Sequence, residues 1–192
     1  RSEGLHTLQR PHRPITLIDA ARGRGSHADT CAVLRVVEGA LVVTRALMGV
    51  EASTSRAWHR AEDDSLARVV VVNMLDRERA DFFRALEGLR SQLSDRCVAV
   101  HVPIGAEPAL TGIVDVLHMC AYMSPEGGKE GDPVEIPAEM ADQAAEYREK
   151  LLDAVVETDE ALMERYLEGQ ELDAEEVASA LKTAVTRGEV FP

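Results

Sequence analysis

The sequence has few aromatic residues and few cysteines. Aromatic residues make up 4% of its 192 positions, so a hydrophobic core has to be built mainly from Val, Leu, Ala and Ile. The three cysteines, Cys31, Cys97 and Cys120, are odd in number and far apart in the chain. This argues against a disulfide framework, and we expect a reducing, cytoplasmic setting.

Long apolar runs and a signal peptide are also missing. Runs such as Val69–Val72 fall far short of the roughly 20 apolar residues that a membrane-spanning helix needs. No charged-then-apolar segment at the N-terminus is typical of a signal peptide. Hydrophobic residues make up 45% of the chain and charged residues 29%, which is typical of a folded globular protein. We therefore expect no membrane partner.

Positive charge is scarce in the second half. Residues 1–100 contain 15 Arg, no Lys and 13 acidic residues, whereas residues 101–192 contain 6 basic and 21 acidic residues. An acidic half disfavours direct nucleic-acid binding there and is compatible with a basic protein partner. The simpler interpretation is that these are solvated helix faces that keep the protein in solution. We expect no sequence-specific nucleic-acid recognition.

Up to Pro103, short apolar segments alternate with helical patterns. After a loop over residues 1–14, the strands expected are 15–19, 40–44, 69–72 and 97–102, and the helices expected are 28–37, 53–64 and 81–93. This alternation predicts an α/β fold, a parallel sheet with helices on both faces. Ligands bind such sheets at the carboxyl ends of the strands.

Beyond Pro103 the pattern is that of a smaller α+β unit. Two short strands or one kinked strand are expected over 110–123, a polar turn over 124–133 and a returning strand over 134–136. Three helices should follow, over 137–156, 159–168 and 173–187, the last two ending at glycine. Residues 190–192 look like the start of another strand.

Candidate binding residues lie at two of the expected loops, those that follow the strands at 15–19 and 69–72. The stretch Arg22–Gly25 could bind a phosphate through backbone N–H groups and guanidinium forks, or could be a plain flexible loop. Asp19 could hold Mg²⁺ through water, or cap the next helix. Asn73 and Asp76 could read a purine edge, or belong to a polar turn. No histidine or cysteine has metal-ligand spacing, and no Gly-x-Ser-x-Gly nucleophile motif occurs.

Several longer stretches, in order, resemble the translational GTPases, and elongation factor G in particular. The resemblance covers about residues 13–192 and rests on Ala80-Asp-Phe-Phe-Arg-Ala85, Val102-Pro-Ile-Gly-Ala-Glu107, Gly112-Ile-Val-Asp115, Glu146-Tyr-Arg-Glu-Lys-Leu-Leu152 and Asp159-Glu-Ala-Leu-Met-Glu-Arg-Tyr-Leu-Glu-Gly169. It implies that residues 1–97 are the C-terminal part of a P-loop-type GTPase domain. Residues 98–192 then correspond to the acidic subdomain inserted in elongation factor G. The elongation factor that delivers tRNA has no such insertion.

The nucleotide motifs that the resemblance implies are altered. The third motif, Asp-Thr-Pro-Gly-His, corresponds to Asp19, Ala20, Ala21, Arg22 and Gly23, of which only Asp19 keeps the family residue and would serve Mg²⁺. Gly23 has no side chain with which to orient an attacking water, as the family's histidine does. The fourth motif, Asn-Lys-x-Asp, corresponds to Asn73, Met74, Leu75 and Asp76. The residues expected to read guanine, Asn73 and Asp76, are kept, and the apolar stem of Met74 replaces a lysine.

The phosphate-binding motif Gly-x-x-x-x-Gly-Lys-[Ser/Thr] is absent from the chain and would precede residue 1. The resemblance implies GTP or GDP and Mg²⁺ as cofactors, weakly bound or unbound by this chain alone. It implies the ribosome as partner, in translocation or recycling. The alternative is a catalytically degenerate relative that docks on the ribosome or its stalk protein through the acidic half. We assign no catalytic residue.

Overall fold

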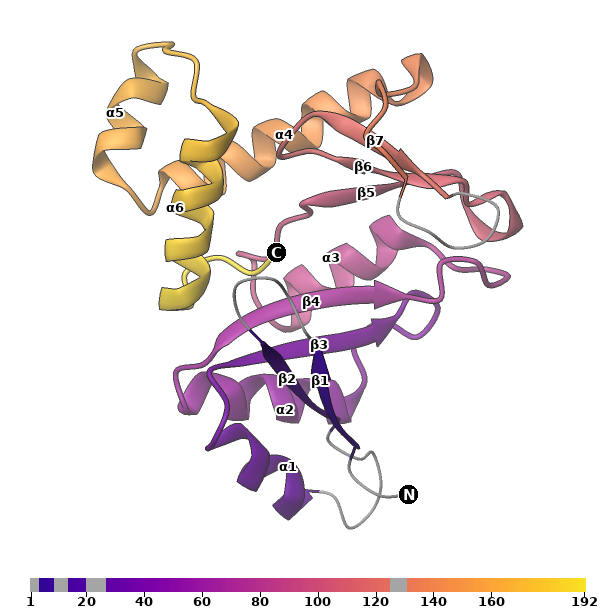
Figure 1. Ribbon diagram of the computed structural model, residues 1–192, viewed down its shortest axis with the longest axis vertical. Coiled ribbons are helices and arrows are strands. Elements are labelled where there is room, and N and C mark those ends of the chain that lie inside the picture. The colour runs from indigo at the N-terminus through magenta and orange to yellow at the C-terminus, as the bar shows by residue number, and fades with distance from the viewer. Residues whose placement is uncertain (1–3, 9–13, 20–26, 125–130) are drawn as a thin grey trace.

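The computed structural model describes residues 4–8, 14–19, 27–124 and 131–192 (Figure 1). Its strands are β1 (Gly4–Leu8), β2 (Ile15–Asp19), β3 (Gly39–Arg45), β4 (Ala67–Asn73), β5 (His101–Ile104), β6 (Gly112–Asp115) and β7 (Cys120–Met123). Its α-helices are α1 (His27–Leu34), α2 (Ala52–Asp63), α3 (Phe82–Gln92), α4 (Ala141–Val156), α5 (Glu160–Leu167) and α6 (Ala174–Arg187). Two short 3₁₀ helices are η1 (Glu107–Ala109) and η2 (Ala138–Met140).

Strands β3 and β4 form a parallel pair joined by helix α2. Their register places Leu41 opposite Val69 and Thr44 opposite Val72. The β-branched run of β4 favours extended backbone, and α2 turns its apolar stripe, with the fully buried Trp58, against the pair. The predicted α/β class, a parallel sheet flanked by helices, is confirmed.

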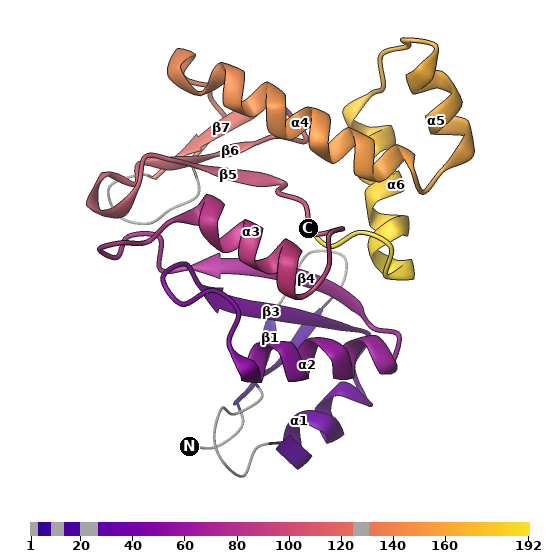
Figure 2. The same cartoon turned by 180° about the vertical axis from the view of Figure 1, so that it is seen from behind.

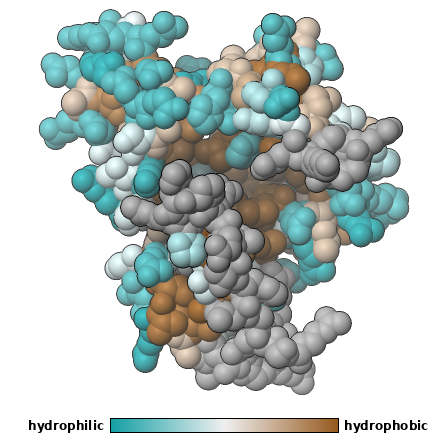
Figure 3. Space-filling model, viewed as in Figure 1, coloured by the Kyte–Doolittle hydropathy of each residue, from teal (hydrophilic) through white to brown (hydrophobic). Residues whose placement is uncertain are grey.

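The expectation that helices cover both faces of this sheet is wrong for the described residues. Val42, Val70 and Val72 pack around Trp58 on one face. On the other face Leu41 is 56% exposed and Val71 39% exposed. Figure 3 shows apolar surface over this region. The strands carry apolar side chains on both faces, as buried parallel strands do, but the described helices pack against only one.

The N-terminal strand prediction also needs correction. Residues 4–8, expected in a loop, form β1, and β2 pairs with β1 in an antiparallel hairpin that sets Gly4 opposite Asp19. The sequence predicts β2 as a buried strand of the parallel sheet, yet Ile15 is 44% exposed and Leu17 40% exposed. The local hairpin satisfies the backbone of β2, but burial needs a second packed layer, which the described residues do not provide.

The predicted fourth strand is displaced toward the C-terminus. Instead of 97–102 ending at Pro103, the structure has β5 over His101–Ile104, antiparallel to β6 in a sheet of order β5-β6-β7. Pro103 is tolerated because β5 is an edge strand, where a missing N–H breaks no ladder. Cys97 lies outside β5 and forms an isolated parallel bridge with Phe191.

The second half follows its prediction more closely. Two strands, β6 and β7, occupy the 110–123 region, and Val134 forms a single bridge to Ala121 rather than a full strand. The expected polar turn lies partly outside the described residues. The three predicted helices are present, and α4 packs against the sheet through residues that include Ala144, Leu151 and Val155 (Figure 2).

The C-terminal residues return to the first half of the chain. The N–H of Phe191 donates to Arg96 O at 3.1 Å, and Phe191 O accepts from the Val98 N–H at 3.0 Å. Pro192 O accepts from the Val70 N–H of β4 at 2.8 Å. The expected strand start at 190–192 therefore lies between β4 and residues 96–98, with the C-terminus beside β4 in Figure 1.

Candidate functional site

The predicted base-reading loop begins where β4 ends. The carbonyl of Asn73 accepts from the Ala46 N–H at 2.9 Å, so the carboxyl ends of β3 and β4 are tied together. The side-chain oxygen of Asn73 accepts from the Met74 N–H at 2.7 Å. Met74 has a φ of 62°, a left-handed conformation that few non-glycine residues adopt. This turn leaves the side-chain NH₂ group of Asn73 as a donor.

Asp76 lies in the turn that follows. The Arg77 N–H donates to Met74 O at 3.3 Å, which folds the chain back after the strand. The Asp76 side chain is 64% exposed, and its Oδ2 lies 3.7 Å from Arg77 Nε. A solvent-facing carboxylate can accept two N–H groups at once. Asp76 therefore has the accessibility that a guanine N1–H and N2–H₂ edge requires.

A residue from the second half holds the same loop. Glu107 Oε1 accepts from the Arg79 N–H at 2.9 Å, and the Glu107 N–H donates to Leu75 O at 3.1 Å. A pocket of about 340 Å³ adjoins these contacts and is lined by residues that include Leu75, Arg79, Asp81 and Glu107. In the sequence Glu107 stands out only as part of a family-like stretch, with no role of its own. The sequence separation between Glu107 and the loop does not predict this contact.

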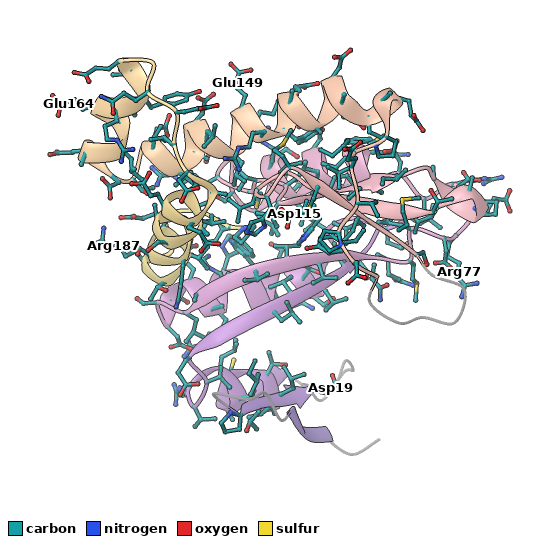
Figure 4. All side chains as sticks on the ribbon, turned by 45° about the horizontal axis from the view of Figure 1, so that its top comes forward. Asp19, Arg77, Asp115, Glu149, Glu164 and Arg187 are labelled. Atoms are coloured by element: carbon teal, nitrogen blue, oxygen red, sulfur yellow. The ribbon has the colours of Figure 1, made fainter. Side chains whose placement is uncertain are left out.

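The predicted phosphate-side residues are placed differently. Asp19 is the last residue of β2 and is exposed, and Figure 4 shows it well apart from Arg77, which follows Asp76. Ala20, Ala21, Arg22 and Gly23 lie outside the described residues. The structure does not bring Asp19 to the Asn73–Asp76 loop, because among the described strands no hydrogen-bonded pairing joins β2 to β3.

The Asn73–Asp76 loop presents groups that are chemically able to meet a purine base. Asn73 offers a donor, Asp76 two acceptors, and the Met74 side chain, 42% exposed, an apolar stem against a planar ring. Among the described positions no group of three His, Cys, Asp or Glu residues could hold a metal ion. Mg²⁺ at Asp19 stays a prediction.

Other perturbed groups lie away from this loop. Burial raises the pKa of the Cys97 thiol to about 11, so the thiol is protonated at neutral pH and is a poor nucleophile. Asp115, 7% exposed, places Oδ2 at 2.7 Å from His118 Nδ1. Burial raises the pKa of Asp115, but hydrogen bonds from the His118 side chain and backbone outweigh it, and the net shift is downward.

No helix in the described part of the chain is both long and apolar enough to cross a membrane. Some of the acidic residues of the second half lie on α4 and α5. Figure 4 shows Glu149 of α4 and Glu164 of α5 pointing outward from the molecule. The acidic residues of α4 and α5 are therefore exposed to solvent and are not part of the core.

The chain is similar in sequence and in structure to known proteins. The sequence profile of the Elongation factor Tu GTP binding domain matches residues 4–186. A crystal structure of a protein from Thermus thermophilus is similar, with a TM-score of 0.89 and 35% sequence identity. The match covers 99% of this chain and 28% of that one, so the chain spans little more than a quarter of that protein's length. The chain belongs to the elongation factor Tu GTP-binding domain family, the GTP-binding domains of translation factors.

Proposed function

We propose that the chain is part of an elongation-factor-G-like translation factor that acts with the ribosome in the cytoplasm, in translocation or recycling. The observation that supports this is the path of the chain. It leaves the β4 side of the molecule after Cys97 and returns at Phe191, which pairs in parallel with Cys97. This path is what an insertion between neighbouring segments of one α/β unit would produce, and it supports the proposal that the second half corresponds to the subdomain inserted in elongation factor G.

The same path supports the domain division that we propose. In this proposal residues 1–97 are the C-terminal part of a GTPase domain and residues 98–192 are the inserted acidic subdomain. The last residues of that subdomain contact the first unit. Phe191 contacts Trp58 of α2, with ring centroids 4.8 Å apart, so the return is packed as well as hydrogen-bonded.

In this proposal Asp76 accepts from the guanine N1–H and N2–H₂, Asn73 donates to the base, and the Met74 stem covers it. Asp19 serves Mg²⁺, and Ala20–Gly23 take the place of the γ-phosphate loop. Mg²⁺, when bound, neutralises phosphate charge. No residue is assigned to catalysis, since Gly23 has no side chain to orient water.

A second candidate is a catalytically degenerate relative that docks on the ribosome or its stalk protein without hydrolysing GTP. The altered residues Ala20–Gly23 and the outward acidic side chains of α4 and α5 favour it (Figure 4). Co-sedimentation of the whole chain with ribosomes in the absence of nucleotide would separate this candidate from the first.

The test of base recognition is a titration of the chain with fluorescent GDP and GTP, with and without Mg²⁺. If the base site forms in this chain, binding is weak but saturable and selective for guanine, because the chain lacks the phosphate-binding motif. D76N should lower GDP affinity on the order of tenfold or more, because an amide presents a donor where the base also donates, and should improve xanthosine diphosphate binding. D63N, at an exposed carboxylate of α2, is the matched control and should bind as the wild type does. Equal GDP affinity of D76N and wild type removes Asp76 from the site.

A further inference from the structure

The loop that contains Asp76 is held at two points by one residue from beyond the proposed domain boundary. Leu75 and Arg79 flank the segment 76–78, and both are hydrogen-bonded to Glu107. The carboxylate accepts from Arg79 N at 2.9 Å, and the Glu107 N–H donates to Leu75 O at 3.1 Å. The backbone on each side of Asp76 is therefore hydrogen-bonded to the same residue, Glu107.

These contacts matter because the loop adopts conformations that its own sequence does not favour. Met74 and Arg79 have φ values of 62° and 63°, in the left-handed region. Such residues cost free energy and persist where the surroundings over-determine them. The charge-assisted hydrogen bond to the Arg79 N–H is such a constraint, because bonds to ionised acceptors are stronger than neutral ones.

Glu107 is itself firmly placed. It begins η1, in the connection between β5 and β6, with a φ of 53°. The Leu110 N–H donates to Glu107 O at 3.2 Å, and the Thr111 N–H donates to Ile104 O at 2.9 Å, which closes the connection. Gly105, at a φ of 81°, admits no side chain, because a Cβ there would clash with the Ala109 carbonyl. The support for the loop thus comes from a β5–β6 connection that is closed by its own hydrogen bonds.

We propose that Glu107 is a positioning residue for base recognition, which sets the orientation of Asp76 by holding the backbone at Leu75 and Arg79. The inference rests on the proposed guanine-binding function. It means that the inserted half takes part in forming the base site, although it contributes no group that touches the base.

The test compares E107A, which removes the accepting oxygen, with E107Q, which keeps one. Amide hydrogen exchange at Arg79, read by NMR without nucleotide, should accelerate on the order of tenfold or more in E107A and stay near wild type in E107Q. E107A should weaken GDP and GTP by the same factor, because Glu107 acts on the base side and not on the phosphates. E107Q should restore most of the affinity. Unchanged fluorescence of the buried Trp58 reports that each variant is folded.

The matched control is E78A, which removes an exposed carboxylate within the same loop. It should leave Arg79 exchange and nucleotide affinity unchanged. The inference is overturned if Arg79 in E107A exchanges at the wild-type rate. It is also overturned if the wild type binds GDP and E107A binds it with equal affinity. If the wild-type chain shows no guanine selectivity, the proposed base recognition by this chain fails. The hold of Glu107 on the loop is then decided by the exchange of Arg79 alone.

Discussion

Asp115 shows how a single carboxylate organises the hairpin between β6 and β7. Its Oδ1 accepts from the N–H groups of Leu117 and His118, at 2.9 and 3.0 Å, and its Oδ2 pairs with His118 Nδ1. Arg148 of α4 donates to the carbonyls of Val116 and Leu117 in the same turn. A nearly buried carboxylate thus has its acceptor sites filled, as a buried charge requires.

The hydrogen bonds to Asp115 give its contribution a defined pH dependence. Its pKa in the folded chain lies below the ordinary value of 3.8, so its contribution to stability is present above that value. The contribution is lost as pH falls through the lowered folded pKa.

We expect D115N to lower the free energy of unfolding by about 1–3 kcal/mol at pH 7, and by less at pH 3. Urea titrations followed by circular dichroism at both pH values measure this. D63N should show no such difference, and an equal loss at both pH values would contradict the assignment.

At the scale of an element, helix α5 also depends on a carboxylate that accepts backbone N–H groups. It has eight residues, a length at which an isolated helix is marginal. Asp159 caps it, because its Oδ1 accepts from the N–H groups of Ala161 and Leu162 at 3.0 and 3.1 Å. Leu162, 8% exposed, anchors the helix to the rest of the second half.

Removal of the cap should therefore destabilise mainly helix α5. D159A is expected to cost about 1 kcal/mol of stability, whereas D159N keeps an accepting oxygen and should cost a few tenths. Thermal unfolding compares the three proteins, and hydrogen exchange over residues 160–167 locates the loss. Equal melting temperatures for D159A and D159N would show that the hydrogen bonds of the cap do not stabilise the helix.

At the scale of the whole molecule, the two halves are joined by the C-terminal segment. The guanidinium of Arg68, a residue only 4% exposed, lies 4.6 Å from the Trp58 ring centre and 4.3 Å from that of Phe191. Its Nη1 also lies 3.2 Å from Glu62 Oε1. A cation over an aromatic ring is attracted by that ring, and Arg68 lies over two. Phe191 thus completes the core of a unit that lies far from it in sequence.

We expect F191A to destabilise the α2–β4 unit by roughly 3–5 kcal/mol, because it leaves a cavity and uncovers Arg68. Trp58 is the only tryptophan in the sequence, so its fluorescence during chemical denaturation reports this unit directly. F191L keeps most of the apolar volume and should lose less. A Trp58 transition in F191A at the wild-type midpoint would mean that residues 190–192 only rest against the first half.

Much of the fold follows from local patterns in the sequence. The β-branched run at Val69–Val72 predicted β4, and the glycine after Arg187 predicted where α6 ends, because both depend on backbone preferences of neighbouring residues. The α/β class and the order of helices in the second half were predicted for the same reason. The loop at Asn73 was predicted as a base reader from its residue types and from family resemblance, and its role stays a proposal.

What the tertiary structure decided is which segments meet. The pairing of β2 with β1 rather than with β3, the open face at Leu41, and the shift of β5 past Cys97 depend on which layers are present to pack. Local sequence carries no record of that. The contact of Glu107 with Arg79 joins positions 28 residues apart, and the Phe191 contact with Trp58 crosses most of the chain. Residue types and spacing alone determined the helices and most of the strands, because each depends on near neighbours. Only the folded chain brought these distant residues together, because such contacts form between surfaces that exist after the elements have packed.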